Sequence, residues 1–112
     1  MAIRLDKDWI DLTDENVQRL SGQLGVYQLG NADGDILYIG VAGGRSLFGL
    51  RGEIGKALDA PPDGATCFRY EVNSTYSTRH QELLMVFRAD HGCLPPANTD
   101  VDESSLGRLS PL

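Results

Sequence analysis

Two short apolar runs on either side of a turn segment constrain what this chain can fold into more than any other feature. Residues 25–29 (GVYQL) and 36–39 (ILYI) flank the segment 30–35 (GNADGD). Runs rich in β-branched and aromatic residues between clusters of Gly, Asn and Asp are typical of paired strands. The Asp-Gly pair at 33–34 tolerates the positive φ angles that a tight hairpin requires. The stretch therefore predicts a β-hairpin.

The predicted hairpin brings two tyrosines together. Successive side chains of a strand point to opposite faces, so Tyr27 and Leu29 are expected on one face of the first strand, with Val26 and Gln28 on the other. Tyr38 lies in the second strand. We therefore expect the two phenol rings to lie close to each other on a rigid platform.

Elements are also predicted before and after the hairpin. Thr13 is a candidate N-cap for a short helix, and a strand with two alternating faces is predicted over residues 66–72. Ser46 is a candidate N-cap for a second helix, which contains Arg51 at the border of its apolar stripe. The members of that stripe recur at spacings of three and four: Leu47, Leu50, Ile54 and Leu58.

A third helix is predicted towards the C-terminus. Thr78 with Gln81 three residues later has the pattern of a capping box, and Gly92 is a natural stop. Glu82 lies at the edge of the inward stripe. That stripe is formed by His80, Leu83, Leu84 and Phe87.

The order of these elements predicts an α+β fold, a small mixed or antiparallel sheet built on a β-hairpin and flanked by helices. We expect an N-terminal helical extension over residues 1–22, a core domain over 23–98 and a C-terminal tail over 99–112.

Composition limits the class of protein. The 112 residues are 41% hydrophobic and 23% charged, which is typical of one globular domain. No run approaches the roughly 20 apolar residues of a membrane span, and two cysteines are too few for a disulfide framework. We therefore expect a cytoplasmic protein with no membrane partner. The formal net charge of −6 disfavours strong non-specific binding to nucleic acid.

The hairpin resembles the signature of the GIY-YIG nuclease superfamily, in which two such tripeptides lie on adjacent strands. The matching tripeptides are Gly25-Val26-Tyr27 and Tyr38-Ile39-Gly40, and the similarity extends over residues 25–98. The chain also carries, in the family's order, an arginine on the next helix, a glutamate on a later helix, and a proline-containing loop with an asparagine: Arg51 (or, less closely, Arg45), Glu82, Pro96 and Asn98.

This resemblance implies a divalent-metal-dependent endonuclease that cleaves phosphodiester bonds in structured or damaged nucleic acid, with DNA as the favoured substrate. Such cleavage needs an activated water, a cation beside the phosphate and a Lewis acid near the leaving oxygen. The family's roles would fall to Tyr27 with Tyr38 as its orienting partner, to Arg51, and to Glu82 as ligand of Mg²⁺ or Mn²⁺. Asn98 completes the implied set. The accessory candidates are His80, Arg45 and Arg79, and a protein partner is a candidate for targeting.

The same residues also have structural interpretations. Tyrosines fit a half-buried strand face, and Arg51 and Glu82 could form a surface ion pair worth about 0–1 kcal/mol. Asn98 could be a turn residue, and His80 a hydrogen-bonded core histidine. The chain also departs from the family at Gly55, one turn after Arg51, where many members carry His or Tyr. The alternative function is therefore a non-catalytic GIY-YIG-fold module that binds protein or nucleic acid.

Two geometric expectations separate these functions. A catalytic domain should bring five side chains onto one concave face: Tyr27, Tyr38, Arg51, Glu82 and Asn98. A nucleic-acid-binding domain should also have a local positive patch within its acidic surface, formed by Arg45, Arg51, Arg79 and Lys56.

Overall fold

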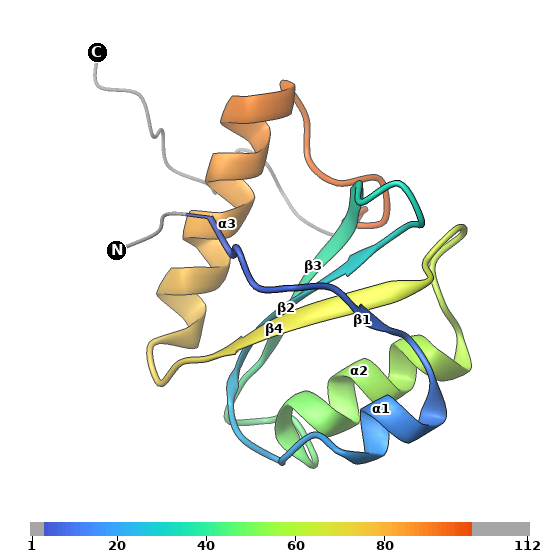
Figure 1. Ribbon diagram of the computed structural model, residues 1–112. Coiled ribbons are helices and arrows are strands. Elements are labelled where there is room, and N and C mark those ends of the chain that lie inside the picture. Colours follow the sequence, from blue (N-terminus) through green and yellow to red (C-terminus); the bar gives the residue numbers. More distant parts are fainter. Residues whose placement is uncertain (1–3, 100–112) are drawn as a thin grey trace.

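A computed structural model describes residues 4–99 of the chain. Four strands form one antiparallel sheet in the order β1-β4-β2-β3, and three helices pack against it (Figure 1). This confirms the predicted α+β class and the hairpin. The elements are β1 (Ile10–Asp11), α1 (Asp14–Gln18), β2 (Gly25–Gly30), β3 (Ile36–Ala42), α2 (Gly49–Asp59), β4 (Cys67–Val72) and α3 (Tyr76–His91).

The sheet separates two layers of helices. Helices α1 and α2 cover one face, and α3 covers the other (Figure 1). Tyr27 lies opposite Gly40 on β3 and Tyr70 on β4, and Leu29 lies opposite Tyr38. Because directly paired residues share a face, both tyrosines of the hairpin point towards α1 and α2. The buried core on this side contains Val17, Leu20, Tyr27, Leu29, Ala42, Leu50, Ile54 and Phe68.

The core beneath α3 uses the other residues of the same strands. Val26 and Ile39 are fully buried there. They pack with Leu5, Leu83 and Leu84. The N-terminal segment therefore contributes to both cores, through Leu5 on one face and through α1 on the other. Each such buried side chain contributes about 1.5–3 kcal/mol of transfer free energy.

Two glycines of the hairpin are required by close approaches. A Cβ atom on Gly25 would lie 2.1 Å from the Glu71 carbonyl oxygen, and one on Gly40 would lie 2.2 Å from Cζ of the Tyr27 ring. Any other residue at Gly40 would push the ring away. This glycine therefore lets the Tyr27 phenol lie across β3.

The start of α2 differs from the prediction. Ser46 is not the N-cap, because its Oγ accepts a hydrogen bond from the Gly43 N–H at 3.1 Å. The residue before the helix is Phe48, which has a φ of 64°. Leu47 was predicted to face inward but is 75% exposed. The loop turns these two apolar side chains outward before the helix begins.

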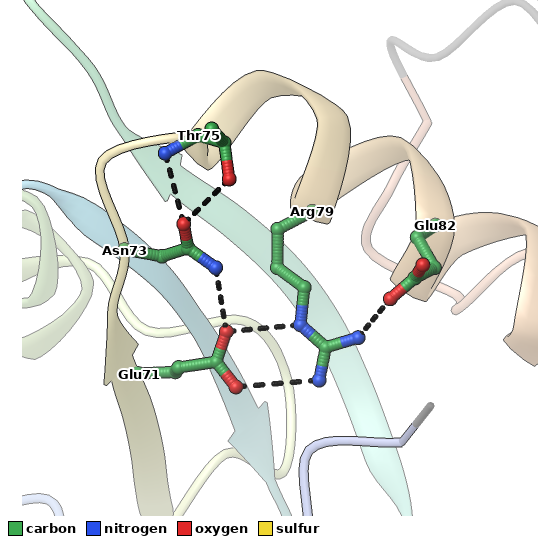
Figure 2. Close-up of polar contacts among 5 residues, drawn as sticks. All are labelled: Glu71, Asn73, Thr75, Arg79 and Glu82. Atoms are coloured by element: carbon green, nitrogen blue, oxygen red, sulfur yellow. Dashed lines mark hydrogen bonds and ion pairs between the residues drawn. The ribbon is translucent and has the colours of Figure 1, made fainter. Parts of the chain in front are cut away.

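Helix α3 also begins earlier than predicted, at Tyr76 instead of Thr78. Asn73 makes this possible, since its Oδ1 accepts hydrogen bonds from the Thr75 N–H at 2.8 Å and the Thr75 hydroxyl at 2.7 Å (Figure 2). The predicted capping box at Thr78 is therefore wrong. The predicted stop is confirmed, because Gly92 is the C-cap with a φ of 80°.

Other local predictions are confirmed. Thr13 caps α1, with its side chain accepting a hydrogen bond from the Asn16 N–H. Leu83 and Leu84 are buried, and His80 and Phe87 are partly buried beside them. Within residues 4–99, no helix has the length and apolar character that crossing a bilayer requires. The predicted tail over 99–112 lies, beyond Thr99, outside the described residues.

Candidate functional site

The tyrosine pair of the hairpin lines a pocket on the α2 side of the sheet. The ring centroids of Tyr27 and Tyr38 lie 5.9 Å apart, with the ring planes tilted by 46°. Together with β2, α2 and the loop before Asn98 they enclose a pocket of about 260 Å³. We call this the tyrosine pocket, and its lining is Tyr27, Leu29, Tyr38, Glu53, Lys56, Ala57, Ala60, Pro62 and Ala97.

Tyr27 is buried deeply enough to keep its proton. It is 4% exposed, and burial strongly raises the pKa of its hydroxyl, with further contributions from Tyr38 and the Glu53 carboxylate. A phenol that stays neutral at physiological pH donates hydrogen bonds but is a poor general base. The implied role of Tyr27 in deprotonating water therefore has little electrostatic support.

Glu53 lines the tyrosine pocket and acts electrostatically on Tyr27, and it is not among the site residues predicted from the sequence. Its side chain is 19% exposed, and its carboxylate lies 3.3 Å from the Lys56 ammonium. It also lines an adjoining hollow of about 470 Å³ that contains Arg45 and Tyr76. A signal was present, since Glu53 follows Leu50 by three residues and precedes Ala57 by four, which places it on the inward side of α2.

Arg51 lies elsewhere. It lines a groove of about 460 Å³ between α1 and α2, together with Asp14 and Asp59. Its guanidinium is 5.9 Å from the centroid of the exposed Phe48 ring. The arginine that the resemblance assigns to the phosphate therefore faces α1 and not the tyrosine pocket.

Glu82 lies across the sheet from the tyrosines, on α3. Its carboxylate accepts a hydrogen bond from Nη1 of Arg79 (Figure 2). Arg79 is 8% exposed and also donates from Nε and Nη2 to the two carboxylate oxygens of Glu71, at 2.9 and 3.3 Å. Glu71 is paired with Val26 and so belongs to the α3 face. One guanidinium thus joins two carboxylates on the far side of the sheet from Tyr27.

The carboxylates of α3 do not fit the implied magnesium or manganese site. The helix carries two, Glu82 and Asp90. Asp90 accepts hydrogen bonds from Arg4 at 2.7 and 2.9 Å, and Glu82 is held by Arg79. A divalent cation at Glu82 would have to displace, or sit beside, a guanidinium of the same sign. Among residues 4–99 no three His, Cys, Asp or Glu side chains are grouped as metal ligands.

Asn98 has a structural role at the edge of the sheet. It is 5% exposed, its Oδ1 accepts from the Ile39 N–H and its Nδ2 donates to the Ile39 carbonyl, both at 2.9 Å. His80 Nε2 lies 3.1 Å from the same carbonyl oxygen, and the Ala97 N–H donates to Leu37. These contacts satisfy the outward backbone groups of Ile39 and the Leu37 carbonyl on the edge strand β3, which would otherwise be unpaired.

The five implied catalytic residues are therefore not assembled. The structure brings Tyr27 and Tyr38 together, and Asn98 lies at the outer edge of β3, the strand that carries Tyr38. It places Arg51 in the groove between α1 and α2, and Glu82 on α3. The expected positive patch is not assembled either, because Arg79 is buried on the α3 face and Lys56 is paired with Glu53.

Comparison with known proteins identifies the family of this chain but assigns no function to it. A family profile described as "Domain of unknown function (DUF7508)" matches residues 3–90, well over half of the 112 residues. No curated protein and no solved structure matches the chain. The match covers the whole sheet and nearly all of α3. The chain therefore belongs to the DUF7508 family.

Proposed function

We propose that this protein is a non-catalytic, GIY-YIG-like module that binds a protein partner at the tyrosine pocket. The observation that carries this proposal is the position of Glu82, which is ion-paired with Arg79 on the opposite face of the sheet from Tyr27 and Tyr38. A single-metal phosphodiesterase needs its metal carboxylate and its tyrosines around one substrate.

The other implied catalytic roles support the same conclusion. Burial holds the pKa of Tyr27 far above neutrality, so the phenol is not poised to take a proton. Arg51 faces the groove with α1, which Asp14 and Asp59 also line. No phosphate at the tyrosines would meet this cation, and a developing negative charge would lack its stabilising partner.

The charge around the pocket favours a protein over a nucleic acid. Lys56 is neutralised by Glu53, and the whole chain carries a formal charge of −6. Affinity for nucleic acid rests mainly on cations that neutralise phosphates. In contrast, tyrosine is one of the residues enriched at protein interfaces, because it combines a large apolar ring with a polar end.

The first experiment tests for cleavage. Hairpin, branched, nicked and single-stranded substrates are incubated with the wild-type protein and Mg²⁺ or Mn²⁺, beside Glu82→Gln, Glu53→Gln and Tyr27→Phe. We expect no product above background in any reaction. Cleavage that disappears in Glu82→Gln would refute the proposal. Cleavage that survives in Glu82→Gln but disappears in Glu53→Gln would support the endonuclease alternative with Glu53 as the essential carboxylate.

The second experiment tests binding. Peptides selected from a display library on the wild-type protein are measured against Tyr38→Ala and against Arg19→Gln, a control at the exposed residue that directly follows α1. We expect Tyr38→Ala to weaken binding at least tenfold and Arg19→Gln to leave it unchanged. Retardation of DNA or RNA at low salt, lost steeply as salt is added, would instead favour the nucleic-acid-binding alternative.

A further inference from the structure

A second, smaller cavity lies on the α3 side of the sheet, away from the tyrosine pocket. It has a volume of about 70 Å³ and is formed by β2, β4, the C-terminal half of α3 and the segment before β1. Part of its wall is apolar, including Leu83 and Phe87, and part is polar, including Gln28 and Arg69. The space holds about five water-sized groups at roughly 10–15 Å³ each.

Gln28 is an unusual residue for its position. It lies on the central strand β2, is 3% exposed and shares its face with Val26. Its Oε1 accepts a hydrogen bond from Nε of Arg69 at 2.7 Å, which fixes the orientation of the amide. The Nε2 group makes no hydrogen bond within residues 4–99. Every fully buried side-chain N or O atom in this part of the chain has a hydrogen-bond partner, so Nε2 of Gln28 is not fully buried. The NH₂ group therefore opens onto the cavity that Gln28 lines.

Arg69 supplies a positive charge beside this amide. Its guanidinium lies 4.1 Å from the centroid of the Trp9 ring, and Nη1 donates to the Lys7 carbonyl at 3.3 Å. None of the ion pairs between described residues includes Arg69. Burying polar and charged groups without full pairing costs free energy. The pair Gln28–Arg69 thus places two kinds of donor, one of them positively charged, next to a small cavity, and the Asp6 carboxylate acts on Arg69 from beyond ion-pair distance.

We infer that this cavity binds a small monocarboxylate such as acetate or propionate. The carboxylate would accept from the Gln28 NH₂ group and pair with Arg69, as charge-assisted hydrogen bonds favour. The short alkyl end would contact Leu83 and Phe87. The volume excludes an aromatic acid. A dianion is disfavoured because Asp90 also lines the cavity, although Arg4 offsets its charge.

The site is independent of the tyrosine pocket. The two lie on opposite faces of the sheet, since Gln28 and Arg69 share the face of Val26 and not that of Tyr27. Binding at one site therefore can be followed without a direct contribution from the other. Failure of the proposed protein-binding function would leave this inference intact.

The test is a titration followed by ¹H–¹⁵N NMR. Sodium acetate and sodium propionate are added to the wild-type protein at constant ionic strength, with sodium chloride as the balancing salt. We expect saturable shifts of the Gln28 side-chain NH₂ and the Arg69 Nε–H signals, with no shift of the Tyr38 backbone amide. Shifts that do not saturate, or that chloride alone reproduces, would overturn the inference and leave a cavity filled by water.

Two variants test the assigned donors. Gln28→Met keeps the length of the side chain and removes the NH₂ group, and Arg69→Lys keeps the charge but loses the planar guanidinium. We expect each to weaken acetate binding at least tenfold, while Arg45→Gln, in the loop between β3 and α2, leaves it unchanged. Wild-type affinity in Gln28→Met would overturn the assignment. If one variant fails to fold, the wild-type titration and the remaining variant still decide.

Discussion

In the ion-paired cluster of Glu71, Arg79 and Glu82, we expect Glu71→Gln to lower the free energy of unfolding much more than Glu82→Gln. Glu71 accepts two hydrogen bonds from Arg79 and one from Asn73 at 3.1 Å (Figure 2), and its side chain is 25% exposed. Hydrogen bonds to charged groups contribute about 1.5–3 kcal/mol when buried. Partial exposure reduces this, so we expect Glu71→Gln to cost about 2 kcal/mol.

Glu82→Gln should cost much less. Glu82 makes its contact within one helix turn, and its side chain is 41% exposed. Such pairs contribute about 0.3–1 kcal/mol. Urea unfolding followed by circular dichroism would measure both variants. In a domain of this size about 1 kcal/mol shifts the Tm by roughly 4–8 °C, so Glu71→Gln should lower it by about 8–16 °C. Equal losses in the two variants would refute this account of the cluster.

The pH dependence of the difference provides a second check. Burial raises the pKa of Glu71, but the hydrogen bonds from Arg79 and Asn73 outweigh it, so the pKa is lowered overall. A carboxyl with a lowered folded-state pKa stabilises the fold fully above its unfolded value of about 4.3. The stabilisation is lost as the pH falls through the folded value. The gap between wild type and Glu71→Gln should therefore be constant above about pH 5 and shrink below pH 4.

Three further predictions concern the loops and the hairpin. Phe48→Gly should raise stability by about 0.5–1 kcal/mol, because Phe48 has a φ of 64° and is 66% exposed; equal or lower stability in urea unfolding would contradict this. Gly40→Ala should cost about 3 kcal/mol or more, since the new Cβ would overlap the Tyr27 ring, and a thermal melt like the wild type would contradict it. Asn98→Ala should cost about 2 kcal/mol, because the Ile39 N–H loses its acceptor and the Ile39 carbonyl keeps only its contact with His80, with faster amide hydrogen exchange at Ile39 as the specific signal.

The hairpin and the faces of its strands could be predicted because the signals are local. Period-two alternation fixes which side chains share a face, and Tyr27 and Leu29 indeed lie with the α2 core, opposite Val26. The helix starts could not be predicted equally well. Asn73 moves the start of α3 to Tyr76 through an Asx-type turn, and this competes with the capping signal at Thr78.

The arrangement of the candidate site was harder to predict. Successive side chains of a helix point in directions that differ by about 100°, so an error of one position changes which neighbour a side chain meets. Glu82 precedes the buried Leu83 and Leu84 but points towards β4, where Arg79 meets Glu71. The clustering of Glu82 with Arg79 and Glu71 depends on the pairing of β4 with β2. The spacing of apolar residues in α3 does not indicate that pairing. Glu53 shows the converse, since its place beside Leu50 and Ala57 was a readable signal.

The residues that carry the nuclease resemblance have different relations to the fold. Gly25 accommodates the Glu71 carbonyl, Gly40 accommodates the Tyr27 ring, and Asn98 closes the backbone edge at Ile39. Each is required by packing or hydrogen bonding in this hairpin, whatever the protein does. Their presence is therefore expected in any chain that builds this arrangement, with or without catalysis. The positions of Arg51 and Glu82 distinguish a catalyst from a binding module, because folding of the sheet does not require these two side chains to lie close together. They lie in separate regions, and for that reason the proposed function is binding.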